Sequence, residues 1–217
     1  MNKPTRIYLQ PTAVRIWHWL NAIGIITLAV TGIQIRFPEY VQPMAFQTAI
    51  SLHNTAGILV AVSFSFWFFY YAVIARSMAR LYVPNREELQ HGLLRQAFYY
   101  FFDYFRGGPS PHHPTPENKF NPMQKSAYLA IMFVLVPLVS LTGILLMNVS
   151  PLREIIMMLG GLKMLVAVHF LLACCLFAFL FTHVYLATLG RTPMAYITPM
   201  WTGWEEVHES EHGKEHT

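Results

Sequence analysis

The chain has 217 residues, of which 54% are hydrophobic and only 12% are charged, and its mean hydropathy is positive. This composition is far from that of an ordinary soluble domain and is typical of a membrane protein. The formal net charge of +4 follows from Lys and Arg residues that flank membrane spans, so no nucleic-acid partner is inferred.

Four uncharged runs are long enough to cross a bilayer, which takes about 20 apolar residues per helix. They predict an all-α protein, an integral membrane four-helix bundle forming a single domain over residues 1–217. The first run is followed by no small-residue cleavage site, so we expect it to stay in the protein. The expected transmembrane helices cover residues 14–36, 50–75, 126–147 and 164–189, with a loop at 76–125 and a flexible tail at 205–217.

The distribution of Lys and Arg predicts the orientation in the membrane. The N-terminal segment, the 76–125 loop and the tail hold twelve of the fifteen Lys and Arg residues, whereas the opposite loops hold only Arg36, Arg153 and Lys163. By the positive-inside rule, both termini are expected in the cytoplasm. We therefore predict a multi-pass protein of the bacterial inner membrane, in contact with membrane lipid.

The 76–125 loop is expected to carry a helix that lies on the inner leaflet. Residues 95–108, RQAFYYFFDYFRGG, place charges among aromatic side chains and end at two glycines. His112 and His113 follow in a proline-rich turn and are interpreted as solvated loop residues, with a two-histidine metal contact as the alternative.

The adjacent Cys174 and Cys175 are interpreted as small packing residues. Two neighbouring cysteines cannot supply the four ligands of an iron–sulfur cluster, and the sequence contains no CxxCH motif for covalent haem.

Four of the ten histidines lie at membrane depth. His18 is near the inner start of the first span, His53 near the outer start of the second, and His169 and His183 near the two ends of the fourth. The last two are fourteen positions apart, which is about 40° short of four full helical turns and about 21 Å along a helix. One face of the fourth span therefore presents an imidazole to each leaflet.

Ionisable groups at this depth are costly and usually functional, and a neutral imidazole is a good ligand for iron. We therefore predict two bis-histidine b haems, an inner one on His18 and His183 and an outer one on His53 and His169. Filling both axial positions favours electron transfer over oxygen binding. Gly32, fourteen residues after His18, leaves space at the depth of the outer haem, although ordinary helix packing explains a glycine there equally well.

Four segments of the chain together resemble one known family. They are RIWHWLNAIGIITLAVTGI (15–33), HNTAGILVA (53–61), KFNPMQK (119–125) and the histidine pair of the fourth span. They are similar to the cytochrome b (gamma) subunit of respiratory formate dehydrogenase and to its relatives in thiosulfate reductases and nickel–iron hydrogenases. The end, LGRTPMAYITPMWTGWEE (189–206), looks closer to the thiosulfate-reductase branch.

The resemblance implies a dihaem subunit that transfers electrons between a partner and membrane quinone. The partners would be an iron–sulfur protein and a catalytic subunit, a molybdopterin enzyme or a hydrogenase, at the outer face, and a higher oligomer of the complex is compatible with this. Asn121 and Gln124 match the family's polar pair at a menaquinone or ubiquinone site beside the inner haem. Pro122 and Met123 depart from the family pattern, which often has glycine at position 123.

Several alternatives stay open at this stage. Asn121 is also a candidate N-cap for the third span, a role compatible with quinone binding. Arg15 and Arg36 flank the two haem depths and could pair with haem propionates, although anchoring at the interface is favoured for both. A stand-alone two-haem quinol oxidase and a haem-free transporter or anchor with proton-relaying histidines are the competing functions. Substrate catalysis by this chain alone is not expected.

Overall fold

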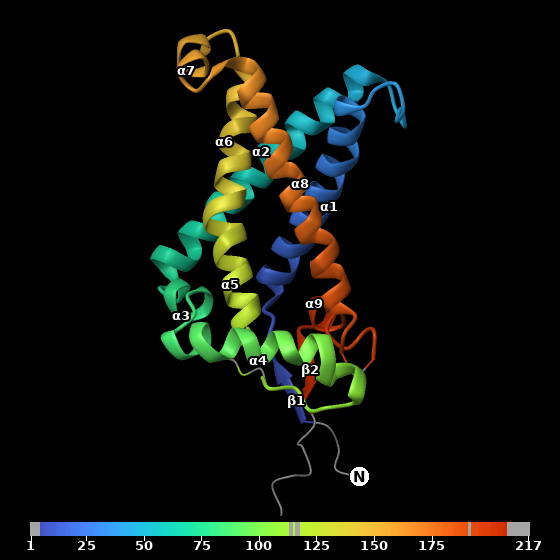
Figure 1. Ribbon diagram of the computed structural model, residues 1–217, viewed down its shortest axis with the longest axis vertical. Helices are drawn as coiled ribbons and strands as arrows, with labels where there is room; N and C mark the ends of the chain where they lie inside the picture. The colour runs from blue at the N-terminus through green and yellow to red at the C-terminus, as the bar shows by residue number, and fades with distance from the viewer. Residues whose placement is uncertain (1–4, 113–114, 116–117, 191, 208–217) are drawn as a thin grey trace, which may run out of the picture. The chain divides into compact units, whose positions relative to one another are not determined.

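The computed structural model describes residues 5–112, 115, 118–190 and 192–207, and most of them are helical (Figure 1). Four helical spans are long and apolar enough to cross a membrane, which confirms the four-span prediction. They cover Thr12–Arg36, Phe46–Ile74, Pro122–Met147 and Gly161–Ala187. Each begins two to four residues before the predicted start, because polar residues of the first helical turn extend the helix beyond its apolar run.

Two of the spans change their helical pitch along their length. The first and fourth spans are the continuous helices α1 (Thr12–Arg36) and α8 (Gly161–Ala187). The second consists of α2 (Phe46–Phe69) and a π-helical turn, Tyr70–Ile74. The third joins α5 (Pro122–Ala130) to α6 (Val136–Met147) through a π-helical turn, Ile131–Leu135.

Pro137 accounts for the π-helical turn in the third span. A proline has no N–H to donate within a helix, and its ring clashes with the carbonyl four residues earlier, here that of Phe133. The helix widens into a π-helical turn over Ile131–Leu135 instead of breaking.

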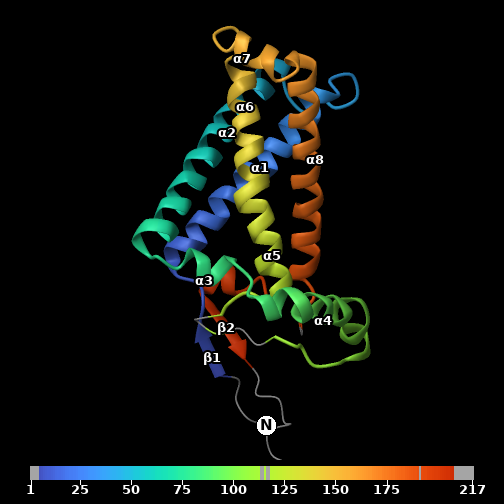
Figure 2. The same ribbon diagram turned by 60° about the vertical axis from the view of Figure 1, so that its left-hand side comes forward.

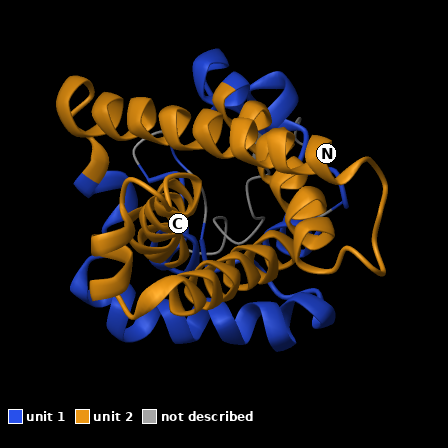
Figure 3. Ribbon diagram, turned by 90° about the horizontal axis from the view of Figure 1, so that it is seen from above, with its two compact units in different colours: residues 1–16, 79–126, 183–217 blue, residues 17–78, 127–182 orange. Residues whose placement is uncertain are grey.

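The chain divides into two compact units, each assembled from segments far apart in the sequence (Figure 3). The larger unit comprises residues 17–78 and 127–182 and contains most of the four spans. Within it α2 contacts α6, and Leu145, Ile156 and Leu165 form an apolar cluster where α6, the short helix α7 (Arg153–Met158) and α8 meet. Many large apolar side chains of its helices stay exposed, as expected for helices that face lipid. The single-domain interpretation stays a prediction.

The smaller unit comprises residues 1–16, 79–126 and 183–217. It contains an antiparallel pair of strands, β1 (Thr5–Tyr8) and β2 (Trp204–Val207), visible as adjacent arrows in Figure 2. It also contains α9 (Pro199–Thr202) and all but the first residue of α3 (Met78–Tyr82). The fold is mainly helical, as predicted, with this short strand pair in addition. The tail predicted to be flexible from residue 205 is a strand up to Val207. Residues 208–217 lie outside the described part of the chain.

The helix predicted at 95–108 is confirmed as a helix. The chain is helical from 86 to 106 and includes α4 (Leu93–Phe98), π-helical turns on both sides of it, Glu88–Gly92 and Tyr99–Asp103, and a final 3₁₀ turn, Tyr104–Arg106. It ends at Gly107, whose φ of +75° suits a left-handed helix cap. Apolar side chains project outward on one part of this helix, whereas Gln96 and Tyr99 are buried.

The strand pair of the smaller unit contains a carboxyl group that makes stability depend on pH. Glu205 lies opposite Ile7, and burial raises its pKa from 4.5 to about 6. Because the folded-state pKa is the higher one, the associated stability is complete below pH 4.5 and is lost as the pH rises through 6. The loss amounts to at most about 2 kcal/mol. We expect Glu205→Gln to raise the thermal unfolding temperature in detergent at pH 8 and to leave it unchanged near pH 4.5. An equal change at both pH values would contradict this account.

Candidate functional site

His53 on α2 and His169 on α8 face one another within the larger unit. Their ring centroids are 6.4 Å apart and their planes are inclined by 75°. Two imidazoles that bind one metal ion from opposite sides place their ring centres about 6 Å apart, because each metal–nitrogen bond is about 2 Å long and each ring adds about 1 Å. The structure therefore brings together the pair predicted for the outer haem at a separation that fits a shared iron.

Each of these histidines is hydrogen-bonded to a threonine on a neighbouring helix. Thr31 Oγ1 on α1 lies 2.9 Å from His53 Nδ1, and Thr142 Oγ1 on α6 lies 2.9 Å from His169 Nδ1. Thr31 is almost fully buried, with 1% of its surface exposed. These contacts occupy the Nδ1 atoms and leave Nε2 as the nitrogen suited to iron on both rings.

A glycine follows each of these threonines and lets the imidazole approach the helix closely. A Cβ atom placed on Gly32 would lie 3.2 Å from His53 Cε1, and one on Gly143 would lie 3.3 Å from His169 Cε1. A larger side chain at either position would therefore push the ring away. At Gly32 the space is taken by the His53 ring, so the clearance expected there for a haem stays a prediction. Gly143, which admits the His169 ring in the same way, was not identified from the sequence.

The two threonines were also missed from the sequence, although a signal was present. The dipeptide Thr–Gly occurs at 31–32 and again at 142–143, on two different spans. Taken alone, each dipeptide is a common feature of packed helices. Only the folded chain shows that both face a histidine in the same way.

The other two predicted ligands fall in different units. His18 lies on α1 in the larger unit, and His183 lies on α8 in the smaller one. Their pairing at an inner haem therefore stays a prediction.

The remaining candidate metal ligands give no further site. Among the described residues, no group of three or more His, Cys, Asp and Glu side chains could hold a metal ion. His112 lies in the turn after the 86–106 helix, where its backbone N–H contacts Ser110 Oγ, and His113 lies outside the described residues. Cys174 and Cys175 are free thiols on the outer surface of α8, so their interpretation as packing residues stays a prediction.

The two arginines considered for haem propionates have different surroundings. The Arg36 guanidinium lies over the rings of Phe37 and Phe170, 5.0 and 5.4 Å from their centroids. Phe170 directly follows the candidate ligand His169, so Arg36 lies near that ligand. Arg15 instead donates to Thr12 Oγ1 and to the Trp201 carbonyl, which ties the start of α1 to α9.

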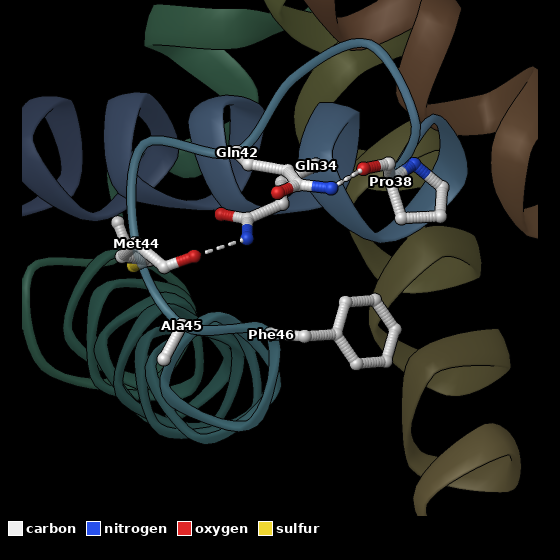
Figure 4. Close-up of a pocket in the computed structure, with 6 residues that line it drawn as sticks. All are labelled: Gln34, Pro38, Gln42, Met44, Ala45 and Phe46. Atoms are coloured by element: carbon white, nitrogen blue, oxygen red, sulfur yellow. Dashed lines mark hydrogen bonds between the residues drawn. The ribbon is translucent and has the colours of Figure 1, made fainter.

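A pocket of about 200 Å³ lies between the end of α1, the loop after it and the start of α2 (Figure 4). The Gln34 amide Nε2 donates to the Met44 carbonyl at 2.6 Å, while its buried Oε1 accepts no hydrogen bond from the described residues. The pocket contains none of the histidines predicted as iron ligands. Its lining residues are Gln34, Pro38, Gln42, Met44, Ala45 and Phe46.

Asn121 and Gln124 cap the start of α5 reciprocally. Asn121 Oδ1 accepts the Gln124 N–H at 2.8 Å, and Gln124 Oε1 accepts the Asn121 N–H at 3.0 Å. This is a capping box, with Pro122 at the first helical position, so the expected N-cap role of Asn121 is confirmed. Pro122, a departure from the family pattern, thus suits the helix start.

The side-chain amides of Asn121 and Gln124 differ in whether their N–H groups already donate a hydrogen bond. Asn121 Nδ2 donates to the Tyr100 hydroxyl at 3.2 Å, and Tyr100 is also hydrogen-bonded to the buried Gln96. Burial raises the pKa of Tyr100, so its hydroxyl stays protonated at neutral pH. Gln124 Nε2 donates to no residue that the structure describes. Of the two predicted residues, Gln124 therefore has the available donor, and Tyr100 is an additional hydroxyl that the sequence analysis had assigned only to an aromatic surface.

Buried cations hold this region together. Lys125 Nζ lies 2.7 Å from Glu88 Oε1, with both side chains largely buried. Burial alone would raise the pKa of Glu88, but hydrogen bonds from Lys125 and from the Asn85 backbone outweigh it and lower the pKa. Lys119 Nζ donates to the Leu9 carbonyl at 2.6 Å, and burial lowers its pKa. These contacts fix α5 against the 86–106 helix and against the segment after β1.

Comparison with known proteins agrees with this geometry. The family model described as prokaryotic cytochrome b561 matches residues 9–203. The chain belongs to the prokaryotic cytochrome b561 family. Members of this family are membrane-bound b-type cytochromes, so this chain is a multi-pass bacterial membrane protein that binds b-type haem.

Individual relatives of this cytochrome b561-family chain support the assignment. It is 31% identical over 200 residues to a protein of Escherichia coli (strain K12) named as cytochrome YdhU, covering 92% of this chain and 74% of that protein. It is 24% identical over 154 residues to a protein of Rhodobacter capsulatus named as a Ni/Fe-hydrogenase B-type cytochrome subunit. That match covers 66% of this chain and 55% of the subunit, so the chain spans about half the length of the hydrogenase relative.

Proposed function

We propose that this chain is the dihaem membrane subunit of a respiratory oxidoreductase complex. In this role it transfers electrons between a partner at the outer face and the membrane quinone pool. The observation that carries the proposal is the facing pair His53 and His169, with both Nδ1 atoms bonded to threonines and with a ring separation that fits one iron.

His53 and His169 would hold the outer haem, and His18 and His183 the inner one. When bound, a bis-histidine b haem supplies reversible one-electron chemistry with no open position for oxygen. The chain contributes the ligands, the spacing between them and an apolar environment. Because His169 and His183 both lie on α8, this helix would contribute one ligand to each site.

The proposed quinone site comprises Gln124 and Tyr100 of the smaller unit. A quinone carbonyl accepts hydrogen bonds, and Gln124 Nε2 is an amide donor with no described partner. The Tyr100 hydroxyl, which accepts a hydrogen bond from the neighbouring cap residue Asn121, is the second polar group of the proposed site. Menaquinone and ubiquinone share this carbonyl chemistry, so the site suits either.

The proposed partners and orientation follow from the relatives and from the charges. Relatives named as Ni/Fe-hydrogenase B-type cytochrome subunits support a complex with catalytic subunits. In the proposed complex these are an iron–sulfur subunit and a catalytic subunit, a molybdopterin enzyme or a hydrogenase, at the outer face. The positive-inside rule places both termini in the cytoplasm. The 86–106 helix would then lie on the inner leaflet, with exposed apolar side chains in lipid: Leu94, Phe98, Phe101, Phe102 and Phe105.

Purification from membranes in mild detergent tests this function. We expect two haems per polypeptide, reduction of both by a quinol analogue, and a co-purifying iron–sulfur protein with a catalytic chain. Two haems and quinol oxidation without any partner would instead support the stand-alone quinol oxidase. A single haem per polypeptide, or haems that a quinol cannot reduce, would contradict the proposal.

A further inference from the structure

We propose that Thr31 and Thr142 are matched positioning residues that fix the tautomer and the ring angle of His53 and His169. The inference rests on the proposed outer haem and adds to it a pair of residues that controls how both ligands are presented. The two threonines occupy equivalent positions, each followed by glycine and each on a helix beside the one that carries the histidine.

The hydrogen of each threonine hydroxyl is already used within its own helix. Thr31 Oγ1 donates to the Thr27 carbonyl at 2.7 Å, and Thr142 Oγ1 donates to the Leu138 carbonyl at 2.9 Å. A hydroxyl has one hydrogen and two acceptor lone pairs, so toward the imidazole it can only accept. The Nδ1 atoms of His53 and His169 must therefore carry the hydrogen.

A second acceptor on each helix supports the same tautomer. The Leu28 carbonyl is an acceptor close to the His53 ring, and the Val139 carbonyl is one close to the His169 ring. Each carbonyl lies three residues before the corresponding threonine. With hydrogen on Nδ1, the lone pair is on Nε2, which is the nitrogen left to bind iron.

These acceptors also affect the electronic properties of the ligand. An imidazole that donates from Nδ1 becomes a more basic ligand at Nε2, and hydrogen-bond partners of a metal-binding imidazole commonly change metal affinity about 10- to 100-fold. A more basic ligand stabilises the ferric state over the ferrous state. The two threonines are therefore expected to lower the midpoint potential of the outer haem.

The ring angle is fixed by contacts on the same two helices. On each ring the edge formed by Nδ1 and Cε1 lies against a Thr–Gly pair, with the hydroxyl on Nδ1 and the glycine against Cε1. The resulting angle of 75° between the ring planes is close to perpendicular. In a ferric bis-imidazole haem, near-perpendicular ligand planes produce a low-spin electron paramagnetic resonance signal with an unusually large principal g value.

Thr31→Val and Thr142→Val, alone and combined, test this inference in the complete haem-loaded protein. Valine keeps the branched shape and removes only the hydroxyl. For each single variant we expect an upward shift in the midpoint potential of one haem, a changed largest g value for that haem, and haem affinity at that site lowered about 10-fold or more. The second haem should keep its potential, and Thr31→Ser should restore the wild-type values.

Thr27→Val is the matched control, because the Thr27 hydroxyl donates to the Ile23 carbonyl at 2.9 Å but contacts no histidine in the described structure. If Thr27→Val lowers haem binding as much as Thr31→Val does, a merely structural role explains the result and the inference is overturned. Valine variants with wild-type potentials and g values would overturn it as well. Failure of the proposed outer haem would be seen separately, as unchanged haem content after His53→Ala.

Discussion

His169→Ala is expected to lower the haem content from two to one per polypeptide. The variant removes one of the two residues that would hold the proposed outer haem, and His53 alone would hold it too weakly to retain it. Electron transfer between an outer partner and quinone should be abolished, because the outer haem would be the first carrier on that side. A pyridine haemochrome assay with a redox titration gives the measurement: one of two midpoint potentials should disappear.

Four further variants decide whether the loss is specific. His53→Ala should remove the same midpoint potential as His169→Ala, whereas His18→Ala and His183→Ala should both remove the other one. His112→Ala changes a loop histidine and should keep both haems. Full haem occupancy in His169→Ala would rule out the ligand assignment, and loss of different haems in His18→Ala and His183→Ala would rule out the inner pairing.

The features that could be predicted from the sequence are those with a strong local signal. Apolar runs of more than 20 residues mark the four spans, since few other structures tolerate such sequences in a chain of this size. The approach of His53 to His169 could be predicted because histidines are costly at membrane depth and their depth follows from position within a span. A basic loop and an aromatic segment likewise predicted the helix now found at 86–106.

The features that could not be predicted depend on contacts between distant residues. The strands β1 and β2 have four residues each and are about 200 residues apart in the chain, so neither has a periodic pattern and their pairing exists only in the fold. The hydroxyl of Thr31 on α1 contacts His53 on α2, and the spacing of these residues in the sequence does not predict that contact. The capping box at Asn121 could be predicted from the local sequence. The hydrogen bond that the Asn121 amide donates to the Tyr100 hydroxyl could not.

Gln124→Glu is expected to reduce quinone turnover by about 5- to 150-fold, the effect of losing one hydrogen bond worth about 1–3 kcal/mol. Glutamate keeps a side-chain oxygen that can accept the Asn121 N–H, so the capping box and the start of α5 should survive. The amide donor is removed, however, and with it the proposed hydrogen bond to the quinone carbonyl. The measurement is quinol-dependent reduction of the haems by stopped-flow spectroscopy, compared with reduction by dithionite.

Gln124→Leu and Asn121→Asp separate the two roles of this pair. Leucine removes both the cap and the donor, so it should lower thermal stability as well as quinone turnover, whereas Gln124→Glu should lower turnover alone. Asn121→Asp keeps the cap oxygen and removes the donor to Tyr100. A loss of turnover in this variant would show that Asn121 must orient the Tyr100 hydroxyl for quinone binding. If quinol reduces the haems of the Gln124→Glu variant at the wild-type rate while the Gln124→Leu variant is unstable, Gln124 serves only to cap α5. The quinone would then bind elsewhere in the membrane domain.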